Sequence, residues 1–339
     1  MQKAKFILGC DISNQTITCC LLEKPGTLLL HPIDFANNID GFEACMEWLK
    51  KNDVETIDIV ACMEHTGVYS EGFCYFLYDC GIKVILESGA KIKSSFKLST
   101  HKTDEIDSIA IAEYAYRYFD RVSGWQPRNS NVEKMKSLLS GRDLLVKKRT
   151  SIKNALVAVQ KKIVKDDILI ESYVELIEML TEKIETIEME MKLLIRTNIQ
   201  WQSKVHIATT IPGIGDLISY NIFVLSNGFS AKLNFKKIAA YLRICPYQYQ
   251  SGSSVYKKNR CPKYGPELLR GYLHLAARSV SVHNKKFRKY YQRKMEEGKP
   301  HKVILNNISN KLIKIICAVV NSGKAYIPSY CSVNPNFLK

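Results

Sequence analysis

Short apolar runs alternate with polar turns over the first 125 residues, as they do in a protein built from strands and helices. Three of these runs come first, which predicts three strands joined as a meander. Two helix-like stretches then alternate with two further apolar strands, and another helix follows. The predicted strands cover 5–13, 16–24, 27–35, 57–64 and 82–88, and the predicted helices cover 41–51 and the region near 69–80.

Beyond residue 131 the apolar residues recur with the period of a helix. A polar linker is predicted at 122–131, a helix at 132–164 and a second long helix after Asp167. Apolar residues in this second helix recur with alternating spacings of three and four, at Ile170, Tyr173, Ile177, Leu180, Ile184, Ile187, Met191 and Leu194. This a/d pattern predicts a coiled-coil seam, formed either by an antiparallel helical hairpin or by a dimerising coiled coil. The length of the seam favours a role in oligomerisation.

The remaining residues, 205–328, predict mainly helices with one irregular polar stretch at 246–266. The patterns together predict an α/β domain at 1–125, a helical coiled-coil region at 126–203 and a mainly α-helical domain at 204–330. No apolar run reaches 18 residues, so no membrane span is expected. The 11 cysteines lack the spacing of a zinc site, which favours buried thiols in the reducing cytoplasm.

Charge divides the chain unevenly and changes the picture of its partners. Residues 1–125 carry 12 Lys and Arg against 18 Asp and Glu, whereas residues 126–339 carry 37 against 15. A basic half this pronounced indicates a polyanionic partner, which is a nucleic acid or a membrane surface. The chain has no lipid anchor motif and no basic amphipathic terminus, so a nucleic acid is favoured.

Four carboxylates fall where the predicted elements would converge. Asp11 ends the first strand, Glu64 ends the fourth, and Asp104 and Asp107 begin the helix after the fifth. The element order is that of an RNase H-like mixed sheet, in which sites form at the carboxyl ends of strands and the starts of helices. Converging carboxylates repel without a cation, and oxygen-only ligation suits Mg²⁺ or Mn²⁺. Taken singly, Asp104 is equally well explained as a helix cap, Asp107 as a helix-start residue and Asp11 as a turn residue.

The segments around these carboxylates carry a resemblance. ILGCDIS, CMEHTGVYS and HKTDEIDSIAIAEYA resemble motif blocks of the DEDD transposases of insertion-sequence family one-ten, whose relatives include the Piv invertases. The block E-x-T-G-x-Y starts at Glu64, and the block K-T-D-x-x-D starts at Lys102. The resemblance implies a RuvC-like N-terminal domain and a catalytic magnesium site made of Asp11, Glu64, Asp104 and Asp107.

Two further blocks of the second half resemble the same family. The turn Pro-Gly-Ile-Gly contains Gly213 and Gly215 and is typical of a helix-hairpin-helix, whose free backbone N–H groups can hold a DNA phosphate. The segment 239–277 resembles the family's block of a proline, a Ser-Gly pair and a basic stretch, at Pro246, Ser251, Gly252, Lys263, Gly265, Leu269 and Arg270. The resemblance covers nearly the whole chain and implies that Ser251 is a nucleophile that forms a transient phosphoserine link to DNA.

One departure from the family pattern leaves the nucleophile open. Gln250 stands where a first serine is common, so Ser253 and Ser254 are alternatives to Ser251. The family places this serine against the carboxylates of another subunit.

Basic residues near this loop and in a later run are candidates for nucleic-acid contacts. They are Lys257, Lys258, Arg260, Lys263, Arg270, Lys285, Lys286, Arg288 and Lys289, with Lys102 in the N-terminal domain. Phe287, Tyr290 and Tyr291 interleave with the later run, and aromatic side chains among cations suit stacking on nucleic-acid bases. The alternative is a helix whose aromatic face packs into the core and whose basic face is solvated.

The resemblance implies a cytoplasmic DNA recombinase that cuts and rejoins donor and target DNA. It further implies guidance by a bridge RNA, Mg²⁺ as cofactor, and dimers that assemble into a tetramer. One alternative is a RuvC-like nuclease that resolves Holliday junctions by metal-assisted hydrolysis. Others are an actin-like or sugar-kinase ATPase, whose further glycine-rich phosphate loops are not found, and a non-catalytic nucleic-acid-binding regulator.

Overall fold

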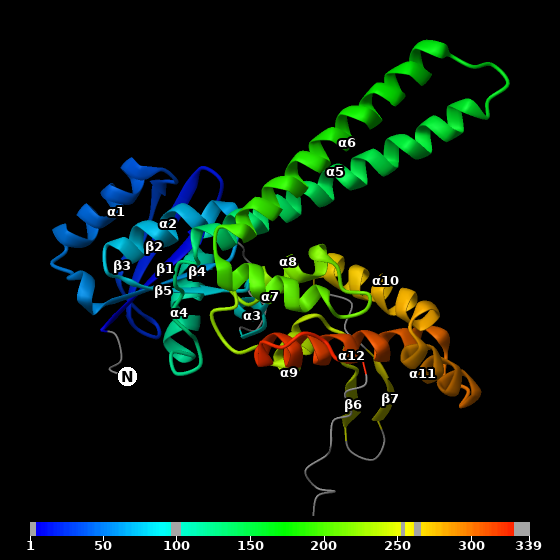
Figure 1. Ribbon diagram of the computed structural model, residues 1–339. Coiled ribbons are helices and arrows are strands. Elements are labelled where there is room, and N and C mark those ends of the chain that lie inside the picture. Colours follow the sequence, from blue (N-terminus) through cyan, green and yellow to red (C-terminus); the bar gives the residue numbers. More distant parts are fainter. Residues whose placement is uncertain (1–4, 96–102, 252–254, 261–265, 329–339) are drawn as a thin grey trace, which may run out of the picture. The chain divides into compact units, whose positions relative to one another are not determined.

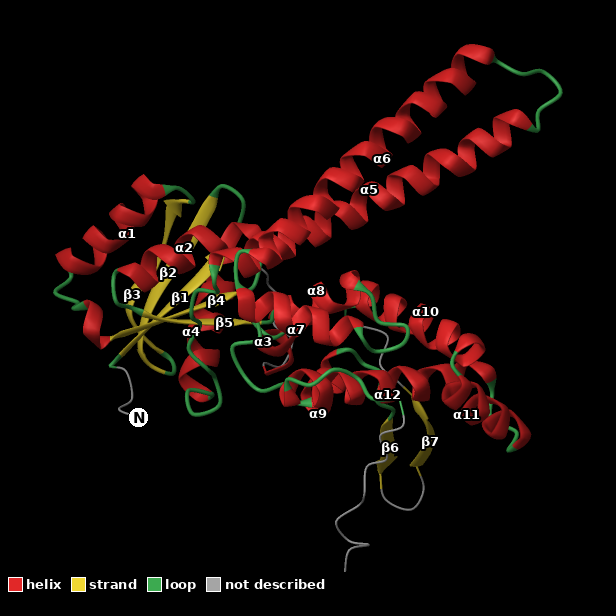
Figure 2. Cartoon of the chain, in the orientation of Figure 1, coloured by secondary structure: helices red, strands yellow, loops and turns green. Residues whose placement is uncertain are grey.

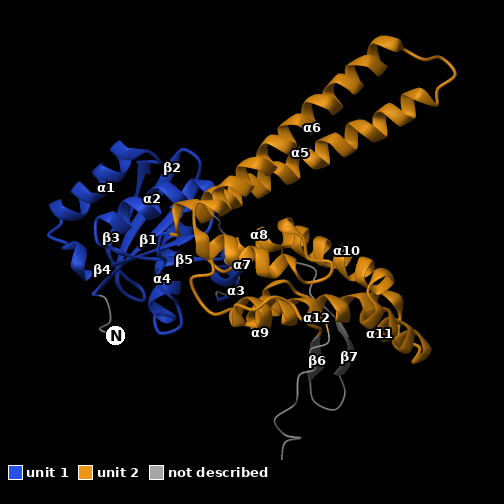
Figure 3. Cartoon of the chain, in the orientation of Figure 1, with its two compact units in different colours: residues 1–127 blue, residues 128–339 orange. Residues whose placement is uncertain are grey.

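The computed structural model describes residues 5–95, 103–251, 255–260 and 266–328, with the backbone alone between 247 and 260. The chain divides into two compact units, residues 1–127 and 128–339 (Figure 3). The first unit contains a mixed sheet, and the second consists mainly of helices (Figure 2).

Unit 1 is built on a five-stranded sheet with the order β3-β2-β1-β4-β5. The strands are β1 (Phe6–Ile12), β2 (Thr16–Lys24), β3 (Thr27–Ala36), β4 (Ile59–Glu64) and β5 (Lys83–Glu87). The first three strands form an antiparallel meander, and β4 and β5 run parallel to β1. The mixed sheet predicted from the sequence is therefore confirmed, and the carboxyl ends of β1, β4 and β5 lie at the same edge.

Helices cover both faces of this sheet. They are α1 (Ile39–Lys51), α2 (Val68–Asp79), α3 (Gly89–Ser95) and α4 (Asp104–Arg117), with a short 3-10 turn at Thr56–Asp58. One core joins α1 and α2 to the face of β1 that carries Leu8 and Cys10, and another joins α3 and α4 to the face that carries Ile7. Burial on both faces explains why the parallel strands are continuous apolar runs in the sequence.

Gly9 in β1 allows α4 to approach the sheet closely. A Cβ atom at this position would lie 2.3 Å from the carbonyl oxygen of Ser108 and 2.6 Å from the Cβ of Ala112, both on α4. The sheet can therefore hold α4, and with it Asp104 and Asp107, only because residue 9 has no side chain.

Gly9→Ala is expected to lower the free energy of unfolding by about 1–3 kcal/mol, because backbone atoms of α4 would have to move. Urea denaturation of the purified protein measures this change. Gly141→Ala is the control, because nothing lies within 4 Å of a Cβ placed there in helix α5. A helix interior prefers alanine to glycine, so the control should be neutral or stabilising. Equal behaviour of the two variants would contradict the close approach.

Two long helices begin unit 2. They are α5 (Ser130–Gln160) and α6 (Asp167–Arg196), which lie side by side as an antiparallel hairpin that we call the arm (Figure 1). Leu180, Ile184, Met191 and Leu194 of the heptad pattern are buried. Of the two arrangements that the heptads allow, one chain therefore contains the hairpin, whereas a coiled coil between copies and its role in oligomerisation stay predictions.

In the described part of unit 2, six further helices form its body. They are α7 (Ile199–Thr209), α8 (Asp216–Leu225), α9 (Phe235–Tyr241), α10 (Glu267–His283), α11 (Lys285–Glu296) and α12 (His301–Ser322). α12 is long and apolar enough by composition to cross a membrane, but half of that stretch is buried. Its residues Ile304, Leu305 and Ile308 pack in the centre of the core of unit 2, which makes α12 a core helix.

The expectation of an irregular stretch at 246–266 is wrong for most of its length. Residues 247–260 contain β6 (Tyr247–Ser251) and β7 (Val255–Arg260), which pair as an antiparallel ribbon. The polar composition concealed the alternation of tyrosine with glutamine in β6, and tyrosine and valine favour strands.

Candidate active site

The four carboxylates of unit 1 start from neighbouring elements. Asp11 is the sixth residue of β1, and Glu64 is the last residue of β4, the strand next to β1 in the sheet. Asp104 and Asp107 occupy the first turn of α4, which packs on β1 and β2. Thr103 is the N-cap of α4, and its side-chain oxygen accepts a hydrogen bond from the backbone N–H of Ile106 at 3.3 Å. The alternative that Asp104 caps this helix is therefore wrong.

Glu64 extends toward the start of α3. A Cβ on Gly89 would lie 1.8 Å from Oε1 of Glu64, so the glycine leaves the space that the carboxylate fills. Gly89 follows β5, which pairs with β4 in parallel, and this pairing sets Glu64 opposite Glu87. Sequence reasoning missed Gly89, because a glycine after a strand normally indicates only a turn.

Electrostatics shows that the other three carboxylates act on Asp11. Its pKa is raised from 3.8 to about 6, first because the carboxyl group is partly buried, and then because of the negative charges of Asp107, Asp104 and Glu64. Within the residues that the structure describes, none of the four forms an ion pair with Lys, Arg or His. Four acidic groups with uncompensated repulsion form a site that would gain from a bound cation.

The donor atoms of this site are carboxylate oxygens alone, which is the donor set that Mg²⁺ and Mn²⁺ prefer. In the described part of the chain, no three His, Cys, Asp or Glu residues are grouped closely enough to form a ready-made metal cage. The carboxylates thus repel one another at longer range. Their chemistry fits a divalent cation, although their present positions do not enclose one.

Thr66 is a second residue near this site that sequence reasoning did not single out for a role. Its hydroxyl oxygen is buried and has no hydrogen-bond partner among the described residues. It follows Glu64 by two positions and precedes Gly67, whose φ of 75° is one that L-residues rarely adopt. An unpaired buried hydroxyl is costly, so Thr66 marks a place where a partner from outside the chain would be favourable.

The predicted nucleophile lies in the β6–β7 ribbon of unit 2. Ser251 is the last residue of β6, and its backbone pairs with Val255. Ser253 and Ser254 lie outside the described residues, as do Lys102 and Lys263. Lys257, Lys258 and Arg260 belong to β7, of which only the backbone is described. Their predicted roles therefore stay predictions.

The Pro-Gly-Ile-Gly turn connects α7 to α8. Gly213 has a φ of 80°, and a Cβ there would lie 2.6 Å from the Val280 side chain on α10, so packing alone requires a glycine. Gly215 begins α8 without a side-chain cap, and nothing lies within 4 Å of a Cβ built on it. Uncapped N–H groups at a helix start can bind a phosphate, which keeps Gly215 a candidate contact.

The aromatic side chains of helix α11 face the core of unit 2, which was the alternative to their stacking on nucleic-acid bases. Phe287 is buried, and Tyr290 and Tyr291 pack against the core of unit 2. Lys311 lies 4.6 Å from the ring centre of Tyr290, so this ring already has a cation over it. The basic side chains Lys285, Lys286, Arg288 and Lys289 are exposed on the other face, whereas Arg270 on α10 is half-buried. Arg288 also donates to the carbonyl oxygen of Val282. Lys285, Lys286 and Lys289 have no ion pair among the described residues, so they are candidates for phosphate contacts.

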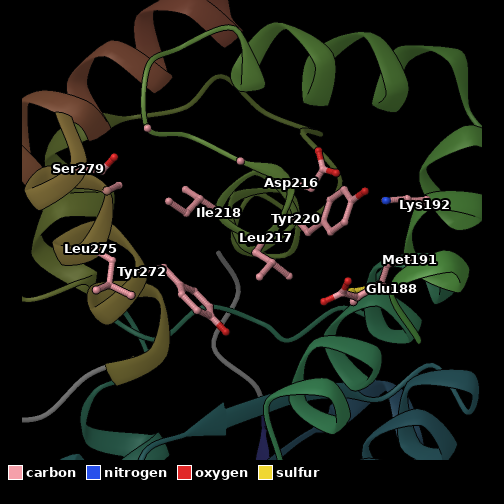
Figure 4. Close-up of a pocket in the computed structure, with 13 residues that line it drawn as sticks. Glu188, Met191, Lys192, Asp216, Leu217, Ile218, Tyr220, Tyr272, Leu275 and Ser279 are labelled. Carbon is pink, nitrogen blue, oxygen red and sulfur yellow. The ribbon is translucent and has the colours of Figure 1, made fainter. Parts of the chain in front are cut away.

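A partly buried polar network joins the root of the arm to α10. The Arg142 guanidinium donates to Glu188 at 2.7 Å, to Asp143 at 3.3 Å and to the Tyr272 hydroxyl at 3.3 Å. The Tyr272 hydroxyl in turn donates to Asp143 at 2.5 Å. Burial, and then the hydrogen bond to Asp143 and the charge of that carboxylate, raises the pKa of Tyr272 to about 12. Tyr272 and Glu188 also line a cavity of about 470 Å³ beside the start of α8 (Figure 4).

Tyr272→Phe is expected to lower the free energy of unfolding by about 1–3 kcal/mol, because Asp143 is only 6% exposed and would lose its hydroxyl donor. Tyr241→Phe on α9 is the control, since Tyr241 is 54% exposed and should change stability by less than about 0.5 kcal/mol. Urea titration of both variants measures the difference. A Tyr272→Phe protein as stable as the control would show that the network contributes little.

Comparison with known proteins defines the class and then the family. A model of the DEDD transposases of IS110 matches residues 8–164, and a model described as the transposase IS116/IS110/IS902 family matches residues 205–292. The pilin gene-inverting proteins of Moraxella lacunata and Moraxella bovis are each 27% identical over 331 residues, which cover 95% of this chain and 98% of the relative. The chain is therefore a DNA recombinase of the transposase class. It belongs to the IS110 family.

Solved structures similar to part of this chain include RuvC of Thermus thermophilus. One, determined in complex with a Holliday junction substrate, covers 35% of this chain and 99% of RuvC, with 11% identity and a TM-score of 0.28. Another RuvC structure from Thermus thermophilus gives 14% identity and a TM-score of 0.26.

Proposed function

We propose that this transposase cuts and rejoins donor and target DNA with Asp11, Glu64, Asp104 and Asp107 as its magnesium ligands. The observation that carries the proposal is the raised pKa of Asp11, which is caused in part by the charges of the other three. When bound, a divalent ion would stabilise negative charge on the oxygens of a phosphate under attack. The carboxylates themselves hold the ion, and α4, docked on Gly9, holds two of them against the sheet.

Ser251 is the proposed nucleophile on DNA. Its hydroxyl oxygen would form a bond to phosphorus while the bond from phosphorus to a deoxyribose oxygen breaks. The serine hydroxyl loses its proton in this step, and the departing sugar oxygen gains one. One phosphate ester replaces another, so rejoining needs no external energy source. Ser251 ends a strand whose pairing with β7 fixes the direction of the backbone at this residue. A backbone fixed in this way supports the assignment, because a nucleophile must be held in one position.

The finer parts of the proposal concern partners. A bridge RNA would pair with donor and target DNA, and the protein would bind the phosphate backbones of these nucleic acids. The exposed lysines Lys285, Lys286 and Lys289 on α11 support such contacts. Several copies of the chain would assemble, as dimers that form a tetramer, so that Ser251 of one copy serves the carboxylates of another.

A covalent intermediate tests this function directly. The protein is incubated with its RNA, donor DNA and Mg²⁺, denatured, and digested with trypsin, and DNA-bound peptides are sequenced by mass spectrometry. We expect a nucleotide adduct on the peptide 244–257 at Ser251, and no adduct when Mg²⁺ is chelated. Cleaved DNA without any protein adduct would instead indicate metal-assisted hydrolysis, as in a junction-resolving nuclease, and an adduct at Ser253 or Ser254 would move the nucleophile.

A further inference from the structure

A pocket of unit 2 lies between α6, α8 and α10, and the chemistry proposed above does not use it. Its volume is about 470 Å³, and ligand pockets in proteins generally measure about 300–1,000 Å³. Met191, Ile218 and Ala276 are buried side chains that line part of it. The ring of Tyr272 lines another part (Figure 4). The pocket therefore offers apolar and aromatic surface to a ligand.

The hydroxyl group of Tyr220 lines the same pocket and lacks a hydrogen-bond partner among the described residues. The residue is only 4% exposed. Burial, and then the charge of Asp216, raises the pKa of Tyr220 to about 12, so the hydroxyl keeps its proton and can donate. A buried hydroxyl without a partner is costly, so a ligand that accepts this hydrogen bond would be favoured.

Asp216, Glu188 and Lys192 bring charges of both signs to the pocket. Glu188 accepts a hydrogen bond from Arg142 at 2.7 Å, whereas Asp216 and Lys192 have no ion pair among the residues that the structure describes. Figure 4 shows the Asp216 carboxylate and the Lys192 amino group on the same side of the pocket as the Tyr220 hydroxyl. Two carboxylates would repel a phosphate, and the two basic groups would repel a free cation. The lining therefore suits a neutral ligand that both donates and accepts hydrogen bonds.

A nucleobase has these properties, and the substrate of a DNA recombinase supplies bases. Every base has two faces that pack on apolar and aromatic side chains, and an edge that carries donors and acceptors. Guanine fits this lining best, because its N1–H and 2-amino groups are adjacent donors that one carboxylate can accept together, while its O6 accepts. The other bases lack two adjacent donors beside an acceptor. A base in a duplex is stacked and paired, so only an unpaired base can enter a pocket.

We propose that this pocket holds one unpaired guanine of a bound DNA or RNA strand. Asp216 accepts from N1–H and the 2-amino group, and Lys192 and Tyr220 donate to O6. The inference goes beyond the proposed function, since it requires a nucleic-acid substrate but neither the role of Asp11 nor that of Ser251. A pocket of this kind lets the protein read one base directly.

Binding of single-stranded oligonucleotides to the full-length protein tests the pocket, with a chelator present so that no strand is cut. One probe is a short oligothymidine with a central guanine, and the other carries hypoxanthine, which lacks the 2-amino group, at the same place. The two strands have the same phosphates, so the phosphate contribution cancels in the ratio of their affinities. We expect fluorescence anisotropy to show that the guanine strand binds on the order of tenfold more tightly, because hypoxanthine loses one hydrogen bond to a charged acceptor.

A matched pair of oligouridine strands separates the two sources of the base. A preference for guanine in both pairs supports a pocket that accepts DNA and RNA. A preference in one pair alone assigns the base to that nucleic acid.

Three variants locate the preference. Asp216→Asn should bind the guanine and hypoxanthine strands equally, within about twofold, because an amide is uncharged and accepts at one atom only. Tyr220→Phe should weaken both strands alike and keep their ratio, since both bases carry O6. Asp167→Asn is the matched control and should keep the wild-type preference, because Asp167 is also an acid in the first turn of a helix, α6, but lies outside the pocket.

A wild-type protein that binds the guanine and hypoxanthine strands equally, in DNA and in RNA, would overturn the proposal. An Asp216→Asn protein that keeps the preference would overturn it as well, because another part of the protein would then read the base. Neither outcome bears on the carboxylates of unit 1 or on Ser251, which the recombination and adduct assays test separately.

Discussion

Replacing Asp11 by asparagine is expected to abolish strand exchange, with a rate loss of at least about a thousandfold, or ~4 kcal/mol of transition-state stabilisation. Asp11 lies on the central strand β1, and Glu64, Asp104 and Asp107 all act on it. An amide keeps the size of the side chain but removes the charge that would hold a divalent ion. A recombination assay with donor and target DNA, in Mg²⁺ and then in Mn²⁺, measures the loss.

The same substitution should stabilise the protein in the absence of metal. The folded state raises the pKa of Asp11 from 3.8 to about 6, so it disfavours the charged form. The free energy of unfolding therefore falls as the pH rises from the unfolded-state pKa to the folded-state pKa of Asp11, and this loss is complete above pH 6. Discounting for partial exposure, Asp11→Asn should raise the free energy of unfolding at pH 7 by about 2 kcal/mol, measured by urea denaturation with a chelator present.

Asp120→Asn provides the control. Asp120 is exposed, and its ion pair with the neighbouring Arg121, at 3.8 Å, is too long and too exposed to contribute much. It should change stability by less than about 0.5 kcal/mol and leave recombination intact. An Asp11→Asn protein that recombines DNA, or that is less stable than the wild type without metal, would contradict the role of Asp11 in a repulsive carboxylate site.

Ser251→Ala is expected to have an effect of similar size, a loss of strand exchange on the order of a thousandfold or more, together with loss of the covalent adduct. The substitution removes one hydroxyl at the end of β6 and should leave the thermal midpoint unchanged. Ser253→Ala and Ser254→Ala are the matched controls, since both retain Ser251 and should recombine normally. Continued DNA cleavage by Ser251→Ala would support a hydrolytic enzyme in which water replaces the serine.

Most of unit 1 could be predicted from its sequence. The strand from 16 to 24 has the predicted bounds, and the other four strands differ by one or two residues at their ends. The physical reason is that each strand is a local apolar run bounded by turn residues, and burial on both faces makes the runs continuous. The candidate carboxylates could be chosen for the same reason, since each stands at the end of a predicted strand or the start of a predicted helix.

The ribbon β6–β7 and the close approach at Gly9 could not be predicted in this way. The ribbon is polar, so its alternation carries no hydrophobic signal, and pairing between distant backbones decides it. Gly9 is one glycine in an apolar run, and only the docking of α4 gives its missing side chain a reason. The heptad pattern likewise predicts an apolar seam on α6, but it does not predict that α5 is the helix packed against this seam.

The sequence by itself determined the kind of chemistry and the kind of partner: four oxygen ligands at element ends, and a basic second half that suits nucleic acid. These follow from residue type and local pattern. The tertiary structure decided which groups influence one another. The pKa of Asp11, raised by burial and by three other carboxylates, and the partly buried Arg142–Asp143–Tyr272 network both depend on segments distant in sequence. It also decided that the heptad residues of α6 are buried against α5 of the same chain, because their burial requires two long segments to pack together.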